Sequence, residues 1–192
     1  MEKRYIFYVI SAVVLLISFI FDNQIVKFIE SMRVETIDIA FIVLSSPYAV
    51  YITLLLVAIL LYKTKHQILT LLSSTILTYI VVVLLKGFIG RPRPEVSTLV
   101  GATASSLPSL HAAIIFMPYA LVSKELPSLR IVYPILAFLV AFSRLYNGVH
   151  FLSDLIVGGL VGYGVGLLLV DLEGKYNYFE KLLGKYATKQ SL

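Results

Sequence analysis

Six long apolar stretches restrict what this 192-residue chain can fold into. About 20 apolar residues in a helix cross the hydrocarbon core of a bilayer. The first, third and sixth stretches suffice as spans, and the other three need their flanking residues. The stretches are Tyr5 to Phe21, Pro47 to Tyr62, Ile68 to Leu85, Leu110 to Val122, Ile131 to Phe142 and Phe151 to Val170. We therefore predict an all-α membrane protein with six transmembrane helices.

The composition separates this prediction from a soluble alternative. The chain is 59% hydrophobic and 14% charged, so a soluble all-α protein would lack polar residues to cover its core. The first stretch lacks a convincing small-x-small cleavage site, which favours an uncleaved helix over a signal peptide. Cysteine is absent, which excludes disulfides and thiol chemistry. Without a detectable linker or repeat, residues 1–192 are expected to form a single integral membrane domain.

The basic residues are distributed unevenly between the two sides of the predicted membrane. The chain has 16 Lys and Arg against 11 Asp and Glu. One side would carry Lys3, Arg4, Lys63, Lys65, Lys124, Arg130, Lys175, Lys181, Lys185 and Lys189. The other would carry Lys27, Arg33, Lys86, Arg91, Arg93 and Arg144. The positive-inside rule then predicts a multi-pass protein of the cell membrane with cytoplasmic termini, and it explains the basic excess without a nucleic-acid partner.

The polar breaks between the stretches predict local structure. Charged and apolar residues alternate from Asp22 to Asp38, which favours a short amphipathic helix on the outer interface. Ser46 before Pro47 is typical of a helix start. The segment from Lys86 to Ser109 is rich in Pro, Gly, Ser and Thr and is expected to form an outer loop. The tail after Asp171 is expected to lie near anionic lipid headgroups.

The sixth stretch carries a face of small residues that recurs every four positions. Such a face lets another helix backbone approach closely, so we expect a role in packing and no role in chemistry. The glycines concerned are Gly158, Gly159, Gly162, Gly164 and Gly166.

Polar residues cluster at the outer ends of the spans and predict an active site on that face. The segments are "KGFIGRPRP" (Lys86 to Pro94), "SLPSLH" (Ser106 to His111) and "SRLYNGVHFLSD" (Ser143 to Asp154). Together they supply Lys, Arg, Ser and His side chains, a combination suited to binding phosphate. Each residue also has a plain structural explanation, such as a cation reaching the interface or a histidine satisfied at a helix end. Their joint placement in a chain sparing of charge favours function.

Local spacing gives these residues possible roles. Pro108 suits the first position of the fourth helix, which would leave the N–H groups of Ser109, Leu110 and His111 as an anion cradle. His150 and Asp154 are four residues apart at the start of the sixth helix, so they share one face. The carboxylate can then accept a proton from one imidazole nitrogen and direct the other into the pocket. A histidine oriented in this way beside a phosphate is a credible nucleophile.

These segments resemble the motifs of the type 2 phosphatidic acid phosphatase superfamily of membrane lipid phosphatases. The first motif is Lys, six residues and Arg-Pro, which corresponds to Lys86, Arg93 and Pro94. The second corresponds to Pro108, Ser109, Leu110 and His111, with leucine in place of the usual glycine. The third corresponds to Ser143, Arg144, His150 and Asp154. The three motifs together cover about an eighth of the chain.

The resemblance implies a mechanism and roles for the site residues. His150 would attack phosphorus to form a phosphohistidine, and Asp154 would orient it. His111 would protonate the leaving oxygen and then activate water. The residues expected to bind the phosphoryl group are Lys86, Arg93, Ser109, Leu110 and Arg144. No metal and no other cofactor should be needed.

The substrate implied is a lipid phosphate or diphosphate whose headgroup reaches an active site facing outside. Family habit and the additional Arg91 favour a polyprenyl diphosphate such as undecaprenyl or dolichyl diphosphate; Arg91 could instead simply lie at the interface. The alternatives are phosphatidic acid or phosphatidylglycerol phosphate, a soluble phosphate ester, or an inactive lipid-phosphate binder or transporter supported by Leu110 alone. Leu110 would be harmless if the glycine contributes only its N–H, which we favour, and would impair or redirect activity if that position needs a positive φ or room for the substrate. Membrane lipids are expected around the protein, and no protein partner is implied.

Overall fold

The computed structural model describes residues 2–189, with side chains described for residues 12–184. Within these ranges the regular secondary structure is entirely helical, which confirms the predicted all-α class. The helices are α1 (Glu2–Ser31), α2 (Glu35–Leu44), α3 (Pro47–Leu60), α4 (Lys65–Ile89), α5 (Leu110–Phe116), α6 (Tyr119–Glu125), α7 (Val132–Tyr146), α8 (Leu152–Tyr176) and α9 (Tyr178–Lys189). A short 3₁₀ helix, Pro127–Leu129, precedes α7.

Several helices have the length and apolarity of membrane spans. In the part of the chain that is described, three segments are each long and apolar enough to cross a membrane. They are Ala12–Ser31 of α1, α4 and α8. Helices α2 and α3, which are bent by 53° relative to each other, are long and apolar enough to form one broken span. Helix α7 is apolar but shorter. Each of the six predicted stretches therefore coincides, to within two residues at its ends, with part of a helix or of a broken pair of helices.

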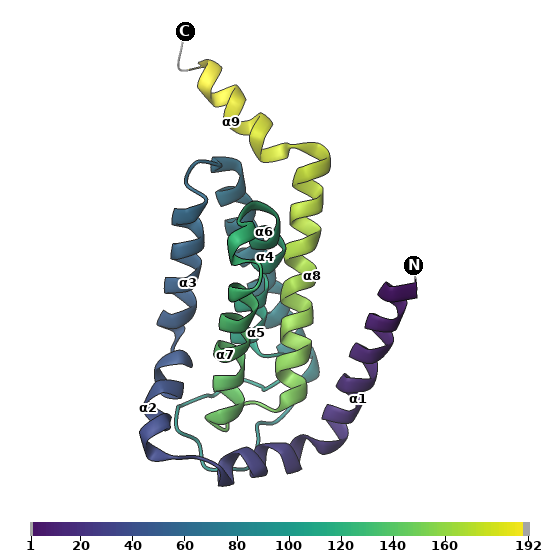
Figure 1. The fold of residues 1–192 in the computed structure, drawn as a ribbon, viewed down its shortest axis with the longest axis vertical. Helices are drawn as coiled ribbons and strands as arrows, with labels where there is room; N and C mark the ends of the chain where they lie inside the picture. The colour runs from purple at the N-terminus through teal and green to yellow at the C-terminus, as the bar shows by residue number, and fades with distance from the viewer. Residues whose placement is uncertain (1, 190–192) are drawn as a thin grey trace.

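Helix α5 occupies the centre of the bundle, where it packs against α3, α4, α7 and α8. The connection between α4 and α5 lies at the lower end of the bundle in Figure 1, together with the starts of α5 and α8. The turn between α1 and α2 lies at the same end, and α9 lies at the other. The predicted site segments therefore gather at one end of the helices.

The start of the second span agrees with its sequence signal. Ser46 is the N-cap of α3, its Oγ accepts a hydrogen bond from the Ala49 N–H at 3.4 Å, and Pro47 follows as the first helical residue. The fourth stretch differs from the single helix expected over Leu110 to Val122. It is divided into α5 and α6 at Met117 and Pro118, because proline has no N–H for a helical hydrogen bond and its ring crowds the preceding turn.

The prediction of a separate interfacial helix from Asp22 to Asp38 was wrong in its bounds. Helix α1 continues to Ser31 and turns across the lower end of the bundle, and α2 begins only at Glu35. Val26 of this segment is 1% exposed and belongs to a core cluster with Leu145 and Phe151. The packing of α1 on the bundle, which local periodicity does not report, explains the difference.

The expected packing role of the glycines is confirmed for three of them. A Cβ added to Gly158, Gly162 or Gly166 would lie 2.5, 1.9 or 2.0 Å from a backbone oxygen of Ser109, Ala113 or Met117, respectively. Gly164 faces open space, with nothing within 4 Å of an added Cβ. Helix α8 thus lies directly on the backbone of α5, and this contact fixes the start of one helix relative to the other.

The tail after α8 is helical. The carboxylate of Glu173, which is 4% exposed, accepts hydrogen bonds from the N–H groups of Phe179 at 3.0 Å and Glu180 at 3.2 Å. These bonds satisfy the first amides of α9. The location of the tail near lipid headgroups stays a prediction, and the side chains of Lys185 and Lys189 lie outside the described ones.

Candidate active site

The eight site residues predicted from the sequence come from five elements that meet at one end of the bundle. Lys86 lies in the last turn of α4 and Arg144 in the last turn of α7. Arg93 belongs to the connection between α4 and α5, and Ser109, Leu110 and His111 open α5. His150 precedes α8, and Asp154 lies in its first turn.

His150 and Asp154 form a buried pair. The His150 Nδ1 atom lies 3.3 Å from Asp154 Oδ2, and the two residues are 2% and 0% exposed. Asp154 Oδ2 also accepts a hydrogen bond from the Phe151 N–H at 2.9 Å, so the carboxylate is fixed by the helix start as well. The other imidazole nitrogen, Nε2, lies 3.4 Å from Arg93 Nη1. The ring is therefore held with one nitrogen on the carboxylate and the other toward a cation.

The surroundings of His150 favour its neutral form. Burial lowers the pKa of His150 to about 4; the nearby charges of Arg144 and Arg93 act in the same direction, and Asp154 opposes them. At neutral pH, with Nδ1 donating to Asp154, the lone pair would lie on Nε2. That is the protonation state a nucleophilic histidine requires.

We expect ¹⁵N NMR of the detergent-solubilised protein to find His150 neutral down to about pH 4, because burial disfavours its charged form. Since the pKa is lowered, the imidazolium signal should appear only as the pH falls through that value. A His150→Asn variant assigns the resonance. A midpoint near 6.5, the ordinary histidine value, would contradict the structural argument.

Lys86 and Arg93 are directed into the protein. The Lys86 ammonium donates hydrogen bonds to the carbonyls of Ser105 and Ser106, the second at 3.3 Å. Arg93 Nε donates to the Ala104 carbonyl at 2.7 Å, and its Nη1 donates to the Val149 carbonyl. Lys86 is thus not a cation that simply extends to the interface. Both residues have more donors than these bonds use, so each can also bind an anion.

Arg144 is the most buried of the three predicted cations, at 7% exposure. Its Nη1 donates to the Ser45 carbonyl at 2.9 Å and to the Ser45 hydroxyl, at the break between α2 and α3. Its Nε is buried without a hydrogen-bond partner among the residues that the structure describes. A buried guanidinium with an unused donor is suited to receive an anionic ligand.

The start of α5 differs from the predicted anion cradle. Pro108 precedes the N-cap instead of occupying the first helical position, and the N-cap is Ser109. The Ser109 N–H donates to the Asp154 backbone carbonyl at 3.0 Å, and its Oγ accepts from the Ala112 N–H at 3.5 Å. The expectation that the Ser109 amide is free for an anion was therefore wrong, because α8 packs closely enough to take that donor.

His111 lies among the charges of the site. Its imidazole interacts electrostatically with Arg144, His150, Arg93 and Lys86. Its Nε2 atom is buried and finds no hydrogen-bond partner within the described part of the chain. Since buried polar atoms in proteins are normally paired, this nitrogen is a candidate for contact with a ligand.

An apolar groove of about 300 Å³ includes His111 in its lining. It is lined by residues from the start of α3, the middle of α4 and the start of α5. They are Pro47, Val50, Tyr51, Leu54, Thr75, Ile76, Tyr79, Leu110, His111 and Ile114. Leu110, the departure from the family motif, thus contributes an apolar side chain to a groove beside the site.

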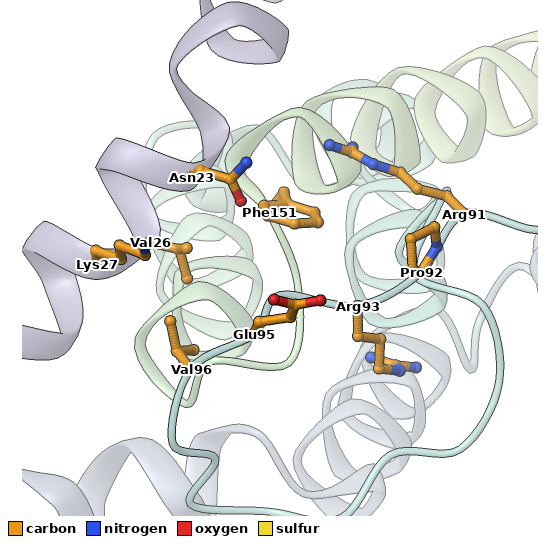
Figure 2. Close-up of a pocket in the computed structure, with 9 residues that line it drawn as sticks. All are labelled: Asn23, Val26, Lys27, Arg91, Pro92, Arg93, Glu95, Val96 and Phe151. Atoms are coloured by element: carbon orange, nitrogen blue, oxygen red, sulfur yellow. The ribbon is translucent and has the colours of Figure 1, made fainter.

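Arg91 has a role that the sequence did not reveal. It donates to Asp22 Oδ2 at 2.8 Å, Asp154 Oδ1 at 2.8 Å and Ser153 Oγ at 2.7 Å. In Figure 2, which looks into a cavity of about 470 Å³ between α1 and the 91–96 segment, the guanidinium groups of Arg91 and Arg93 point in opposite directions. Because its guanidinium is engaged by these partners, the structure does not support the prediction that Arg91 binds a second phosphate.

Sequence reasoning did not assign functions to Asp22, Ser45 or Ser153. Ser45 contacts Arg144, whereas Asp22 and Ser153 contact Arg91, which in turn pairs with Asp154. Asp22 carried a signal, because it lies within the helical segment Ala12–Ser31, and acidic residues within membrane spans are rare. The two serines carried none, because serine is common at helix starts and turns.

Comparisons with known proteins find similar sequences. The model of the PAP2 superfamily matches residues 67–178. Phosphatidylglycerophosphatase B of Bacillus subtilis (strain 168) is 40% identical over 100 residues, a match covering 46% of this chain and 47% of that protein. The chain thus spans about half the length of this curated relative.

Two crystal structures have similar folds. One is described as the first transmembrane PAP2 type phosphatidylglycerolphosphate phosphatase from Bacillus subtilis; it has a TM-score of 0.73 and 23% identity, and covers 93% of this chain and 98% of its own. The other, Aquifex aeolicus LpxE, has a TM-score of 0.68 and 27% identity, and covers 78% of this chain and 94% of its own. Both extend well beyond the segments that carry the site.

Proposed function

Because the chain belongs to the PAP2 superfamily, we propose that it is a membrane phosphatase that hydrolyses a lipid phosphate through a phosphohistidine intermediate. The arrangement of His150 carries this proposal. Its Nδ1 is held by Asp154, and its Nε2 lies 3.4 Å from Arg93, where a phosphoryl group would be bound. A neutral, oriented imidazole beside a cationic pocket has the properties of a nucleophile for phosphorus.

In the first step, the Nε2 lone pair of His150 attacks phosphorus and forms a P–N bond. The P–O bond to the lipid breaks, and the leaving oxygen takes a proton from His111, whose charged form requires the bound phosphate anion to offset the burial and the neighbouring cations. Asp154 keeps the Nδ1 proton in place and stabilises the positive charge that develops on the imidazole. Lys86, Arg93 and Arg144 offset the negative charge on the phosphoryl oxygens.

In the second step, water attacks the phosphohistidine and gives a proton to His111. The P–N bond breaks, inorganic phosphate leaves, and His150 regains its lone pair. His111 carries the proton needed for the next turnover. The buried, unpartnered Nε2 of His111 supports this role within the described structure.

We propose that the reaction requires no metal ion. The positive charge that a divalent metal supplies to phosphoryl transfer elsewhere would come here from Lys86, Arg93 and Arg144. Ser109 completes the pocket through its hydroxyl, which can donate a hydrogen bond while its oxygen accepts the Ala112 N–H.

The groove beside the site supports a lipid substrate. Its apolar walls meet the site at His111, so an acyl chain could lie in it while the phosphate contacts the cations. With Arg91 engaged elsewhere, the residue-based argument for a polyprenyl diphosphate is gone. The relatives' names favour phosphatidylglycerol phosphate, and we propose it as the substrate. The headgroup would enter from the outer face of the membrane, with the termini on the cytoplasmic side.

A substrate panel tests this function. We expect purified protein in mixed micelles to release phosphate from phosphatidylglycerol phosphate at least about 10-fold faster, per kcat/KM, than from undecaprenyl diphosphate or phosphatidic acid. Glucose 6-phosphate should be hydrolysed far more slowly, because it leaves the apolar groove empty. Phosphate release over time is the measurement.

Two results would contradict the proposal. Equal rates on glucose 6-phosphate and the lipids would show that the groove is irrelevant, and no release from any of these esters would favour a binder over an enzyme. Adding EDTA to the same assay tests metal independence, since loss of activity that Mg²⁺ restores would contradict it.

A further inference from the structure

Behind the catalytic pair lies a buried charge cluster that joins α1 to the start of α8. Arg91 donates to Asp22 and Asp154, with 2.8 Å separating the atoms of each pair. Ser153 donates from its hydroxyl and, at 3.1 Å, from its N–H to the Asp22 carboxylate. Asp22, Ser153 and Asp154 are 2%, 0% and 0% exposed. The two carboxylates are therefore shielded from solvent, whereas 20% of the Arg91 side chain is exposed.

Arg91 is held on its faces as well as at its edges. Its guanidinium carbon lies 4.2 Å from the ring centroid of Phe151 and 5.3 Å from that of Phe19. Stacking of this kind restricts the plane in which a guanidinium can donate. Arg91 thus has a defined orientation, with one edge toward Asp22 and the other toward Asp154.

The charge balance of this cluster has a consequence for His150. If Arg91 faced Asp154 alone, the pair would be neutral, and little net charge would remain to stabilise the imidazolium formed upon phosphorylation. Because Arg91 pairs with Asp22 as well as with Asp154, the three side chains together carry a net charge of −1. In a buried site, one such charge behind the imidazole acts at low effective dielectric constant.

We propose that Asp22 is a positioning residue for the hydrolysis that acts through Arg91: it offsets the charge of Arg91, so that a net negative charge remains behind the imidazole of His150. It touches neither the substrate nor the reacting atoms. A buried ionisable residue in an apolar span is costly and by default suggests a function. This inference rests on the proposed phosphohistidine mechanism.

The variant Asp22→Asn tests the proposal with little risk to folding. Asparagine retains an oxygen acceptor for Ser153, and Arg91 remains paired with Asp154, so no buried charge loses its partner. We expect kcat to fall roughly 10- to 100-fold, the range typical for loss of an outer partner at metal sites. KM and inhibition by inorganic phosphate should change less than about 2-fold, whereas vanadate, which forms a pentacoordinate adduct with a nucleophile, should bind more weakly by a factor similar to the loss in kcat.

A charge-restoring double variant separates this role from a structural one. In Asp22→Asn with Arg91→Gln, Asp154 alone carries the net charge of −1, so kcat should recover relative to Asp22→Asn. If Asp22 merely fastened α1 to the bundle, removal of both residues would weaken that contact further and kcat would fall again. A double variant less active than Asp22→Asn would overturn the proposal.

Glu30→Gln is the matched control on the same helix. Glu30 Oε1 accepts a hydrogen bond from the Ser97 N–H at 2.8 Å, so it also joins α1 to the 90–109 connection but does not contact Arg91 or Asp154. We expect its kcat to stay within about 3-fold of the parent. Equal losses in Glu30→Gln and Asp22→Asn would overturn the proposal.

The same assays distinguish failure of this inference from failure of the function. If the parent protein releases no phosphate from the lipid panel, the proposed function fails. If the parent is active and Asp22→Asn matches it in kcat and in vanadate inhibition, only the role of Asp22 fails.

Discussion

His150→Ala is expected to lower phosphate release by roughly 10⁴- to 10⁶-fold, because it removes the atom that we propose bonds to phosphorus. The remaining cations would still bind the headgroup, so KM or the affinity for a non-hydrolysable lipid phosphonate should change little. The phosphoenzyme should disappear as well. Rapid acid-free quenching with a ³²P-labelled substrate measures the intermediate, and steady-state assays measure the turnover.

His66→Ala provides the matched histidine control. His66 lies in the first turn of α4, at the opposite end of that helix from Lys86, and should leave kcat within about 2-fold of the parent. Turnover that persists in His150→Ala would exclude His150 as the nucleophile. A label that survives in this variant but is lost in His111→Ala would assign the covalent step to His111 instead.

Gly162→Ala is expected to destabilise the protein by about 3 kcal/mol, at the upper end of the range for overpacked cores. The added Cβ would lie 1.9 Å from the Ala113 carbonyl oxygen, so α8 would have to move away from α5. For a chain of this size the melting temperature should fall by about 6 to 12 °C. Thermal unfolding in detergent by circular dichroism measures the change.

Gly164→Ala is the control for helix propensity. It lies on the same helix but has nothing within 4 Å of an added Cβ, so the substitution should be neutral or stabilise by up to about 1 kcal/mol. Equal melting temperatures for the two variants would show that α8 does not approach α5 as closely as described. Loss of activity in Gly162→Ala, beyond loss of stability, is also expected, because its helix carries Asp154 while α5 carries His111.

The large features of the fold could be predicted because hydrophobicity alone determines them. Each apolar stretch became a helix or a broken helix, and the Ser46-Pro47 signal gave the start of α3 correctly. The glycine face was likewise readable, since a period of four on an apolar helix has a direct packing meaning. The break at Pro118 was not predicted, although proline interrupts helices, because the apolar residues continue on both sides of it.

The candidate site was predictable in its members and less so in its connections. The four-residue spacing of His150 and Asp154 brings them together within one helical turn. The partners of Arg91, in contrast, are Asp22 and Asp154, which lie 69 and 63 residues away in the sequence. Local patterns carry no information on such pairs. The Ser109 N–H was misjudged for the same reason, since its acceptor comes from α8.

Asp154 illustrates a limit on what sequence comparison can say about relatives of this protein. Its carboxylate accepts a hydrogen bond from the Phe151 N–H at the start of α8. It also pairs with Arg91 and contacts His150. In a descendant that had given up hydrolysis, this aspartate would still stabilise the start of α8. The presence of this aspartate in a related chain therefore indicates a shared fold. The imidazoles of His111 and His150 are better indicators of hydrolytic activity.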